Sequence, residues 1–302
     1  MTVSKTAVIG AGTMGIGIAH SLAVGGFEVV LVDAIPSALD RALASIEENL
    51  ATGVQRGKLS EEDARAARAR ISTAANISAA ANADLVIEAV PEDLSLKHEI
   101  FKKLDALCAA DALLATNTSA LSITEIAAAV RDPSRVIGMH YFNPAHIMKL
   151  VEIVRGLETA DHSVEVAEQV AKRCGKETVI INEAPGFATS RINAMIGNEA
   201  FYMLMEGVAS ARDIDKALKL GLNHPMGPFE MIDLVGLDTR LKVLEYLHAT
   251  LGEKFRPCPL LVKYVKAGRL GKKVGRGVYD YPKELTEVEA SKKRKAPSVN
   301  MA

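Results

Sequence analysis

Cysteine and aromatic residues are scarce in this chain. Its 302 residues include three cysteines and no tryptophan, and only 4% of them are aromatic. The cysteines, Cys108, Cys174 and Cys258, are odd in number, lie far apart and form no CxxC pair. The sequence therefore indicates neither a disulfide framework nor a zinc ribbon. Three reduced thiols are typical of a cytoplasmic protein, which is the localisation that we expect.

Excess charge and long apolar runs are missing as well. Lys plus Arg number 36 and Asp plus Glu 37, which leaves a net charge of −1. This balance gives no overall attraction to nucleic acid or to anionic membranes, and we expect neither as a partner. No apolar run approaches the roughly 18 residues that a spanning helix requires. The apolar N-terminus carries a glycine pattern and lacks a small-residue cleavage site, so we interpret it as part of the fold.

What the first half does contain is a regular alternation of strand-like and helical segments. Apolar residues at helical spacing predict helices such as 92–109 and 161–174. Short runs rich in Val, Ile and Leu predict strands at 6–9, 28–32, 83–88, 112–115, 135–139, 149–154 and 178–181. Such strands separated by helices favour a parallel sheet covered on both faces. We therefore predict an α/β fold, a doubly wound Rossmann-type domain over residues 1–184.

The second half has a different pattern. After Pro185-Gly186, which marks a turn, strand-like runs almost disappear and apolar residues recur at helical spacing. Residues 185–282 are therefore predicted to form an all-helical domain. Its first helix contains three methionines that could line a compliant pocket or lie in the core, and we favour the core: Met195, Met203 and Met205. Residues 283–302 are polar, include the run Lys-Lys-Arg-Lys at 292–295, and are predicted to form a solvated, flexible tail.

A glycine-rich motif follows the first predicted strand. Residues 10–15 read Gly-Ala-Gly-Thr-Met-Gly, which is GxGxxG, and they open an apolar helix. Gly10 permits a tight turn, Gly12 lets the backbone approach a pyrophosphate, and Gly15 lets the helix pack closely on the sheet. The unpaired N–H groups at the start of the helix then face the phosphates, and Met14 lies in this loop. The motif predicts a dinucleotide site.

The next strand supports the same interpretation. It ends at Asp33, eighteen residues after Gly15, where a carboxylate accepts hydrogen bonds from the adenosine ribose. The same charge would repel a 2′-phosphate, and Ala-Ile-Pro follows it in place of an arginine. NAD is therefore the predicted cofactor, in preference to NADP.

A candidate catalytic pair lies further along the chain. His140 ends a predicted strand, and ligands of open α/β sheets bind beyond the carboxyl ends of the strands. Hydride transfer from an alcohol needs a base near pH 7, which an imidazole provides. Glu152 is the one charge in an otherwise apolar strand and is the expected partner. A metal site built on His140 and His146 is not indicated, because neither has a Cys or a second carboxylate at ligand spacing.

Polar residues follow another strand end. The segment Thr116-Asn117-Thr118-Ser119 has hydroxyl and amide groups that could hold a substrate carbonyl and the nicotinamide ribose. The same residues could equally form an ordinary polar turn.

Several motifs together carry a family resemblance. GAGTMGIGIA, EAVPEDLSLK, TNTSAL, HYFNP, KLVEIV, EAPGF and NHPMGPFEMIDLVGLDT occur in this order, and the chain resembles the L-3-hydroxyacyl-CoA dehydrogenase family over residues 4–282. The resemblance implies NAD-linked oxidation of (S)-3-hydroxyacyl-CoA to 3-oxoacyl-CoA. It also implies that the helical domain forms a homodimer.

The resemblance also implies roles for individual residues. His140 matches the catalytic base and Glu152 its orienting acid, while Ser119 matches a residue that contacts both substrate and cofactor. The remaining cofactor-site positions, beside Asn117 above, are Glu92, Lys97, Asn143 and Lys273. On the substrate side, Asn143, Arg56 and Lys58 are expected to contribute, the last two toward coenzyme A. Ser190 stands where the family commonly has an asparagine, and it acts either as a weak substrate contact or as a helix N-cap.

Two other functions stay open at this point. The chain could be a dehydrogenase of a hydroxy acid that carries no CoA, or an NAD-binding relative without turnover. The presence of both His140 and Glu152 favours turnover. The sequence leaves the acyl chain length and the pathway undecided, and a short substrate such as 3-hydroxybutyryl-CoA is our expectation.

Overall fold

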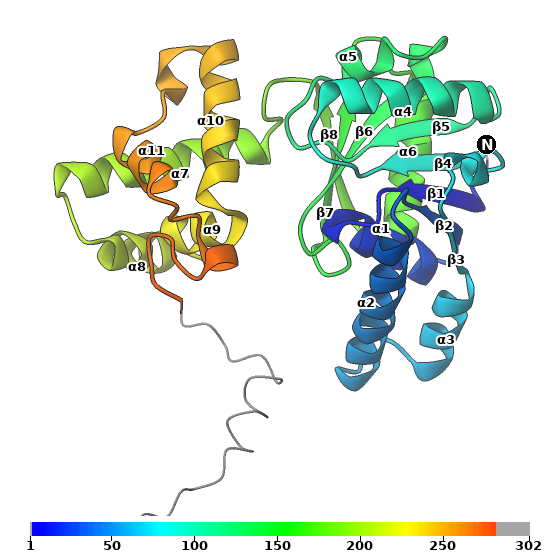
Figure 1. Cartoon of the computed structure of the whole chain (residues 1–302), viewed down its shortest axis with the longest axis horizontal. Coiled ribbons are helices and arrows are strands. Elements are labelled where there is room, and N and C mark those ends of the chain that lie inside the picture. Colours follow the sequence, from blue (N-terminus) through cyan, green and yellow to red (C-terminus); the bar gives the residue numbers. More distant parts are fainter. Residues whose placement is uncertain (1, 282–302) are drawn as a thin grey trace, which may run out of the picture. The chain divides into compact units, whose positions relative to one another are not determined.

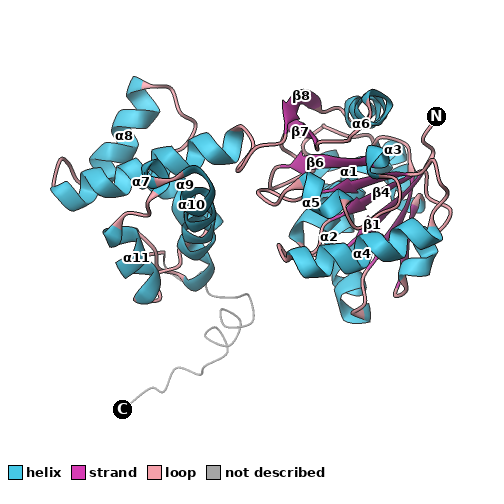
Figure 2. Ribbon diagram, turned by 90° about the horizontal axis from the view of Figure 1, so that it is seen from above, coloured by secondary structure: helices cyan, strands magenta, loops and turns pink. Residues whose placement is uncertain are grey.

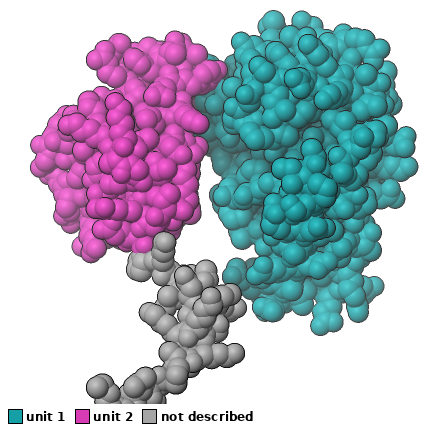
Figure 3. Space-filling model, in the orientation of Figure 1, with its two compact units in different colours: residues 1–190 teal, residues 191–302 magenta. Residues whose placement is uncertain are grey.

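The computed structural model describes residues 2–281. The chain divides into two compact units between Ser190 and Arg191 (Figure 3). This division lies a few residues after the 184/185 boundary expected from the sequence. The tail expected at 283–302 lies outside the described residues, as does its basic run. Within the described part of the chain, no helix is long and apolar enough to cross a membrane.

An eight-stranded sheet forms the centre of the first unit (Figure 1). Its strand order is β3-β2-β1-β4-β5-β6-β7-β8. All neighbours are parallel except β6 and β7, which are antiparallel. The strands are β1 (Lys5–Ile9), β2 (Glu28–Val32), β3 (Ile71–Ala74), β4 (Leu85–Glu88), β5 (Leu113–Thr116), β6 (Val136–Tyr141), β7 (Leu150–Arg155) and β8 (Glu177–Asn182). The first six follow the order of a doubly wound dinucleotide-binding domain.

The sequence-based prediction was wrong on two points of the sheet. It missed β3, a four-residue edge strand whose sequence is Ile-Ser-Thr-Ala. Two central polar residues gave it no apolar run, because both are exposed at the sheet edge. The expected all-parallel arrangement also fails at β6 and β7. Only eight residues separate these two strands, too few for the crossover that a parallel pair needs.

Helices cover both faces of the sheet (Figure 2). Apolar residues of α1, α2 and α6 form one core against the strands, and those of α4 and α5 form another on the opposite face. The helices are α1 (Thr13–Val24), α2 (Pro36–Gln55), α3 (Glu61–Ala69), α4 (Leu94–Leu107), α5 (Ile123–Ala127) and α6 (Asp161–Arg173). Local signals define their starts. Ser60 caps α3 and Asp93 caps α4, each side chain accepting a hydrogen bond from a backbone N–H of the first turn.

The second unit is helical, as predicted. Its helices are α7 (Thr189–Glu206, beginning in the last residues of the first unit), α8 (Ala211–Gly221), α9 (Pro228–Val235), α10 (Leu237–Leu251) and α11 (Pro259–Lys266). Short 3₁₀ turns lie at η1 (Ile77–Ala80), η2 (Pro133–Arg135), η3 (Glu253–Phe255) and η4 (Lys272–Val274). Phe201, Phe229 and Leu244 belong to one buried cluster of this unit.

The methionines of α7 differ from expectation. Met203 packs against the core of the second unit. Met195 and Met205 are 39% and 44% exposed, so assigning them to the core was wrong. The helix buries Ala194 and Phe201 on its inner side, and the two methionines lie on the side left open.

Candidate functional site

The glycine-rich loop joins β1 to α1 at the carboxyl end of the sheet. Gly10 has a φ of +107°, and a Cβ there would lie 2.8 Å from the carbonyl oxygen of Ala89. A Cβ on Gly15 would overlap the carbonyl oxygen of Gly10. Around Gly12, by contrast, nothing lies within 4 Å of the position a Cβ would take. Gly10 and Gly15 thus allow close backbone packing, and Gly12 leaves room for a ligand.

The start of α1 also fits a pyrophosphate. Gly12 caps the helix and provides no side-chain acceptor for the first-turn N–H groups. These groups and the positive end of the helix dipole are what an anion binds. The side chain of Met14 packs against the core of the first unit. The part of Met14 that a ligand can reach is therefore its backbone.

Asp33 lies beside this loop, directly after β2. Its carboxylate accepts hydrogen bonds from the backbone N–H of Ala11 at 2.8 Å and of Ile35 at 2.9 Å. These two bonds fix the carboxylate next to the glycine turn. The carboxylate, the open space at Gly12 and the uncapped helix together fit NAD, with the ribose at Asp33 and the pyrophosphate at α1.

His140 and Glu152 form the pair that the sequence suggested. The antiparallel register of β6 and β7 places the two residues directly opposite each other. The Nδ1 atom of His140 lies 2.7 Å from Oε2 of Glu152. The other carboxylate oxygen accepts a hydrogen bond from the N–H of Thr189 at 2.9 Å. Glu152 is fully buried and His140 is 5% exposed, so the pair is shielded from solvent.

The electrostatics of the pair follow from these contacts. Burial by itself raises the pKa of Glu152. The hydrogen bonds from His140 and Thr189 outweigh burial, and the pKa of the carboxyl is lowered. An ionised Glu152 accepts the proton of His140 Nδ1–H, which leaves Nε2 as the nitrogen able to exchange a proton with a substrate. The ring centroids of Phe142 and Phe187 lie 4.5 Å and 5.8 Å from the centroid of the imidazole, and the two rings complete its apolar surroundings.

The segment after β5 is tied to the same strand end. The side-chain oxygen of Asn117 accepts a hydrogen bond from the N–H of Tyr141 at 2.9 Å, next to His140. Ser119 donates its N–H to Glu92 at 2.6 Å. Among the described residues, neither the Asn117 NH₂ nor the Ser119 hydroxyl has a hydrogen-bond partner. The segment therefore presents these two groups at the strand ends without a partner from the described residues.

A buried ion pair lies next to this segment. Lys97 Nζ lies 2.7 Å from Oε1 of Glu88, with exposed fractions of 1% and 0% for the two side chains. The same ammonium lies 3.5 Å from Glu92, which accepts hydrogen bonds from Thr118 Oγ1 and from Ser119 N–H. These contacts favour a positioning role for Lys97 over a direct cofactor contact. Sequence reasoning missed Glu88, although it is the one charge in the apolar run Leu-Val-Ile-Glu, the signal that had identified Glu152.

The remaining predicted residues lie in four places. Asn143 is exposed shortly after His140. Arg56 and Lys58, at the end of α2 and just beyond it, line a cavity of about 430 Å³. Lys273 belongs to the second unit, where its ammonium pairs with Asp238 at 2.6 Å. Ser190 lies in the first turn of α7, which begins at Thr189, so interpreting it as the N-cap was wrong.

Residues 2–281 contain no group of three or more His, Cys, Asp or Glu side chains able to hold a metal ion. His140 instead uses Nδ1 for Glu152.

Known proteins are similar to this chain in both sequence and fold. Residues 5–184 match the description "3-hydroxyacyl-CoA dehydrogenase, NAD binding domain" and residues 186–281 match the C-terminal domain of the same family. The chain belongs to the 3-hydroxyacyl-CoA dehydrogenase family. Its first unit contains the NAD-binding domain, which confirms the predicted cofactor, the oxidoreductase class and the fold.

Individual relatives of this dehydrogenase are similar along nearly their whole length. A probable 3-hydroxybutyryl-CoA dehydrogenase of Bacillus subtilis (strain 168) is 47% identical over 287 residues, which covers 95% of this chain and 100% of the relative. A 3-hydroxybutyryl-CoA dehydrogenase of Bradyrhizobium diazoefficiens is 45% identical, covering 92% and 96%. The crystal structure of (S)-3-hydroxybutyryl-CoA dehydrogenase from Ralstonia eutropha has a TM-score of 0.90 at 42% identity, covering 93% of this chain and 100% of that one.

Proposed function

We propose that this dehydrogenase interconverts (S)-3-hydroxybutyryl-CoA and acetoacetyl-CoA with NAD. The observation that carries the proposal is the buried His140–Glu152 pair at 2.7 Å, at the end of the sheet where the glycine-rich loop lies. Relatives named for 3-hydroxybutyryl-CoA support the short acyl chain. Bound NAD supplies the hydride acceptor.

Side chains of the first unit have separate roles in moving the proton of the substrate's 3-hydroxyl group. In the oxidative direction, His140 Nε2 accepts the proton of the 3-hydroxyl group. Glu152 holds the imidazole in the tautomer with Nδ1–H and stabilises the imidazolium that forms. In the reductive direction, the imidazolium returns the proton to the 3-oxo oxygen. The Ser119 hydroxyl and the Asn117 amide are the donors offered to substrate and cofactor. Ser190, with one O–H on a short side chain, contributes at most a weak substrate contact.

The coenzyme A portion of the substrate needs cations, because it carries phosphates. Arg56 and Lys58 are both exposed and line one cavity of the first unit. We assign them to the CoA phosphates. Neither forms an ion pair with a described residue, so both ammonium and guanidinium groups remain available to an anion.

Turnover tests the proposal directly. We expect a decrease in absorbance at 340 nm when the protein is mixed with NADH and acetoacetyl-CoA. Across 3-oxoacyl-CoAs from C4 to C16, kcat/KM should be highest at the short end. A hydroxy acid without CoA should not be a substrate, and turnover of such an acid in place of acetoacetyl-CoA would show that the CoA assignment is wrong. A complete lack of turnover with bound NADH would instead identify a non-catalytic NAD-binding protein.

Cofactor choice gives a second prediction. Asp33 should make kcat/KM higher for NADH than for NADPH, because its carboxylate binds ribose hydroxyls and repels a 2′-phosphate. The double substitution Asp33→Ala, Ala34→Arg should shift the ratio of kcat/KM toward NADPH. The single substitution Ala34→Arg is the control, since it adds a cation and keeps the carboxylate. A wild-type enzyme that already prefers NADPH would contradict the role of Asp33.

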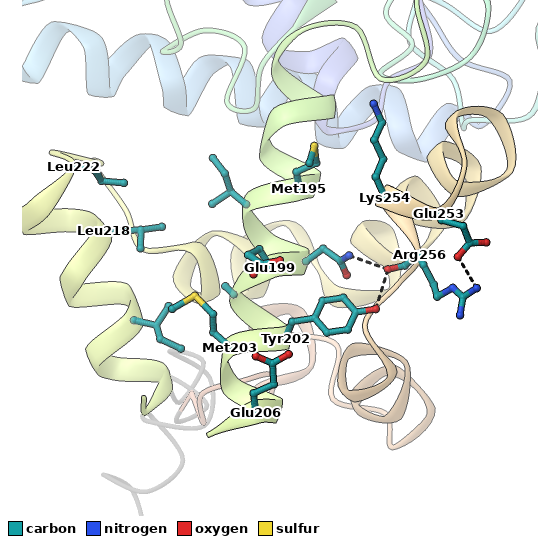
Figure 4. Close-up of a pocket in the computed structure, with 14 residues that line it drawn as sticks. Met195, Glu199, Tyr202, Met203, Glu206, Leu218, Leu222, Glu253, Lys254 and Arg256 are labelled. Atoms are coloured by element: carbon teal, nitrogen blue, oxygen red, sulfur yellow. Dashed lines mark hydrogen bonds and ion pairs between the residues drawn. The ribbon is translucent and has the colours of Figure 1, made fainter. Parts of the chain in front are cut away.

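We also propose that the second unit forms a homodimer, in the cytoplasm. This unit exposes several large apolar side chains, and large exposed apolar patches mark sites of protein–protein contact. They are Ile192, Met195, Met205, Val208, Leu220, Leu222, Leu234, Val235 and Val274. Met195 and Met203 of α7, Leu218 of α8 and Leu222 directly after α8 line a cavity of about 790 Å³ (Figure 4). Sedimentation at micromolar concentration should give twice the 32.2 kDa mass of the chain.

A further inference from the structure

The cavity that contains Arg56 and Lys58 is built entirely within the first unit. It lies among α1, α2 and the segment 146–149, and its volume is about 430 Å³. Three cations line it, namely Arg56, Lys58 and Lys149, and no carboxylate is found among its described lining residues. A cavity with this charge balance suits an anion.

Two histidines line the same cavity and have no role in the proton chemistry of His140. His20 comes from α1 and His146 from the segment after β6. Their ring centroids lie 5.1 Å apart. Nδ1 of His20 is buried and has no hydrogen-bond partner among the described residues. A buried polar atom without a partner is rare in folded proteins, and here it belongs to a residue that lines a cationic cavity.

The neighbouring backbone holds the two rings in place. Lys176 donates hydrogen bonds from Nζ to the carbonyl oxygens of Ala145 and Met148, at 2.6 Å and 2.9 Å. Ser21, one residue after His20, donates its hydroxyl to the same Ala145 carbonyl at 3.2 Å. A Cβ on Gly17 would lie 2.9 Å from that of Ala145, so α1 and this segment are in close contact. The two backbone segments that carry His20 and His146 are therefore held close together.

The surroundings of both rings favour their uncharged form in the protein alone. Burial, together with the neighbouring His146 and Lys176, lowers the pKa of His20 to about 4. Burial and Lys176 also lower the pKa of His146. The other charged groups that line the cavity, Arg56, Lys58 and Lys149, are cations as well. At neutral pH the two imidazoles thus contribute no charge until an anion arrives.

We propose that His20 and His146 bind a phosphate group of the CoA substrate and take up a proton from solvent when it binds. The inference rests on the proposed function, because the anion is part of the CoA substrate. An opposite charge within about 4–6 Å favours the charged form of an imidazole and moves its pKa by roughly one to three. Such a change brings the pKa of His20 from about 4 toward neutrality. The enzyme should therefore bind CoA substrates more tightly as the pH falls.

The size of the effect follows from proton linkage. With a rise of about three in its pKa, from about 4 in the free protein, the imidazole binds one additional proton in the complex between the two pKa values. Between pH 8 and pH 6, this uptake strengthens binding by about tenfold. The gain is complete below the pKa of the free protein and disappears as the pH rises through that of the complex. The phosphate monoester of CoA also titrates near pH 6 and acts in the opposite direction, so a variant comparison is needed.

The test compares KM for acetoacetyl-CoA at pH 6 and pH 8 with saturating NADH. The variant is the double substitution His20→Gln, His146→Gln, which keeps polar side chains that cannot become charged. The control is His162→Gln, at an exposed position of α6. The ratio of KM at pH 8 to KM at pH 6 should be about tenfold larger in the wild type and the control than in the double variant. Equal ratios in all three proteins would overturn the inference while leaving the activity, and with it the proposed function, intact.

Calorimetry on the wild type provides a measurement that needs no variant. CoA titrated at pH 7 in two buffers of different ionisation enthalpy should show uptake of a fraction of a proton or more. Binding of CoA without proton uptake would contradict the inference. 3′-Dephospho-CoA distinguishes the two phosphate sources, because loss of uptake assigns the 3′-phosphate to the histidines and retained uptake assigns the pyrophosphate. A wild type that binds CoA with proton uptake and does not reduce acetoacetyl-CoA would refute the proposed reaction alone.

Discussion

Substitution of His140 by glutamine is expected to lower kcat by about 10² to 10⁴, the usual contribution of general acid–base catalysis. Glutamine nearly preserves the volume of the imidazole and can still meet Glu152, but it cannot take a proton from a hydroxyl group. KM for NADH should change little, because the glycine-rich loop and Asp33 are untouched. The measurement is initial rates with acetoacetyl-CoA and NADH, together with a melting curve to show that the variant is folded.

Glu152→Gln and the double variant complete the experiment. The carboxyl of Glu152 has a lowered pKa and is therefore the ionised partner of His140 near neutral pH. The neutral amide of the glutamine in Glu152→Gln cannot stabilise an imidazolium, so kcat should fall in this variant as well. The double variant should lose little more than the worse single variant, since the two residues act as one unit. Losses that multiply, or a near-normal kcat in His140→Gln, would contradict the assignment.

Local signals predicted much of this pair and its surroundings. The glycine motif and Asp33 could be assigned because their spacing encodes a strand, a turn and a helix start. Glu152 could be assigned because one charge in an apolar strand requires a partner. The direct opposition of His140 and Glu152 could not be predicted from that argument. It results from the antiparallel pairing of β6 and β7, whereas the sequence analysis expected parallel strands.

Glu88 is a second case in which a contact could not be predicted from local signals in the sequence. Both members of its ion pair were present in the sequence, nine residues apart, and only Lys97 was singled out. Their contact depends on the turn between β4 and α4, which brings the ammonium back to the end of β4. The prediction for exposed residues such as Met195 was wrong for a related reason. Several helices pack near the apolar side of α7, and helical spacing alone does not show which methionines reach the core.

The Glu88–Lys97 pair is where substitution should affect stability most. Removal of one partner from a buried ion pair leaves an uncompensated charge and costs about 3–5 kcal/mol. Lys97→Met keeps a long side chain of similar volume, so the loss should arise from the isolated Glu88 carboxylate. We expect the free energy of unfolding, measured in urea, to fall by about that amount. The exposed lysine of the same helix, substituted as Lys103→Met, should leave it unchanged within about 0.5 kcal/mol.

A second substitution separates charge from packing. In Lys97→Met, Glu88→Gln the buried charge is gone, and the glutamine oxygen can still accept a hydrogen bond from Thr116 or Val90, as Glu88 does in the wild type. The double variant should therefore be more stable than Lys97→Met alone, since the substitution of Glu88 rescues part of the loss. In both variants Glu92 has lost the ammonium at 3.5 Å and is less constrained where it holds the Ser119 N–H. KM for NADH should rise in both, even where stability is restored. A double variant no more stable than the single one would show that packing, not the isolated carboxylate, accounts for the loss.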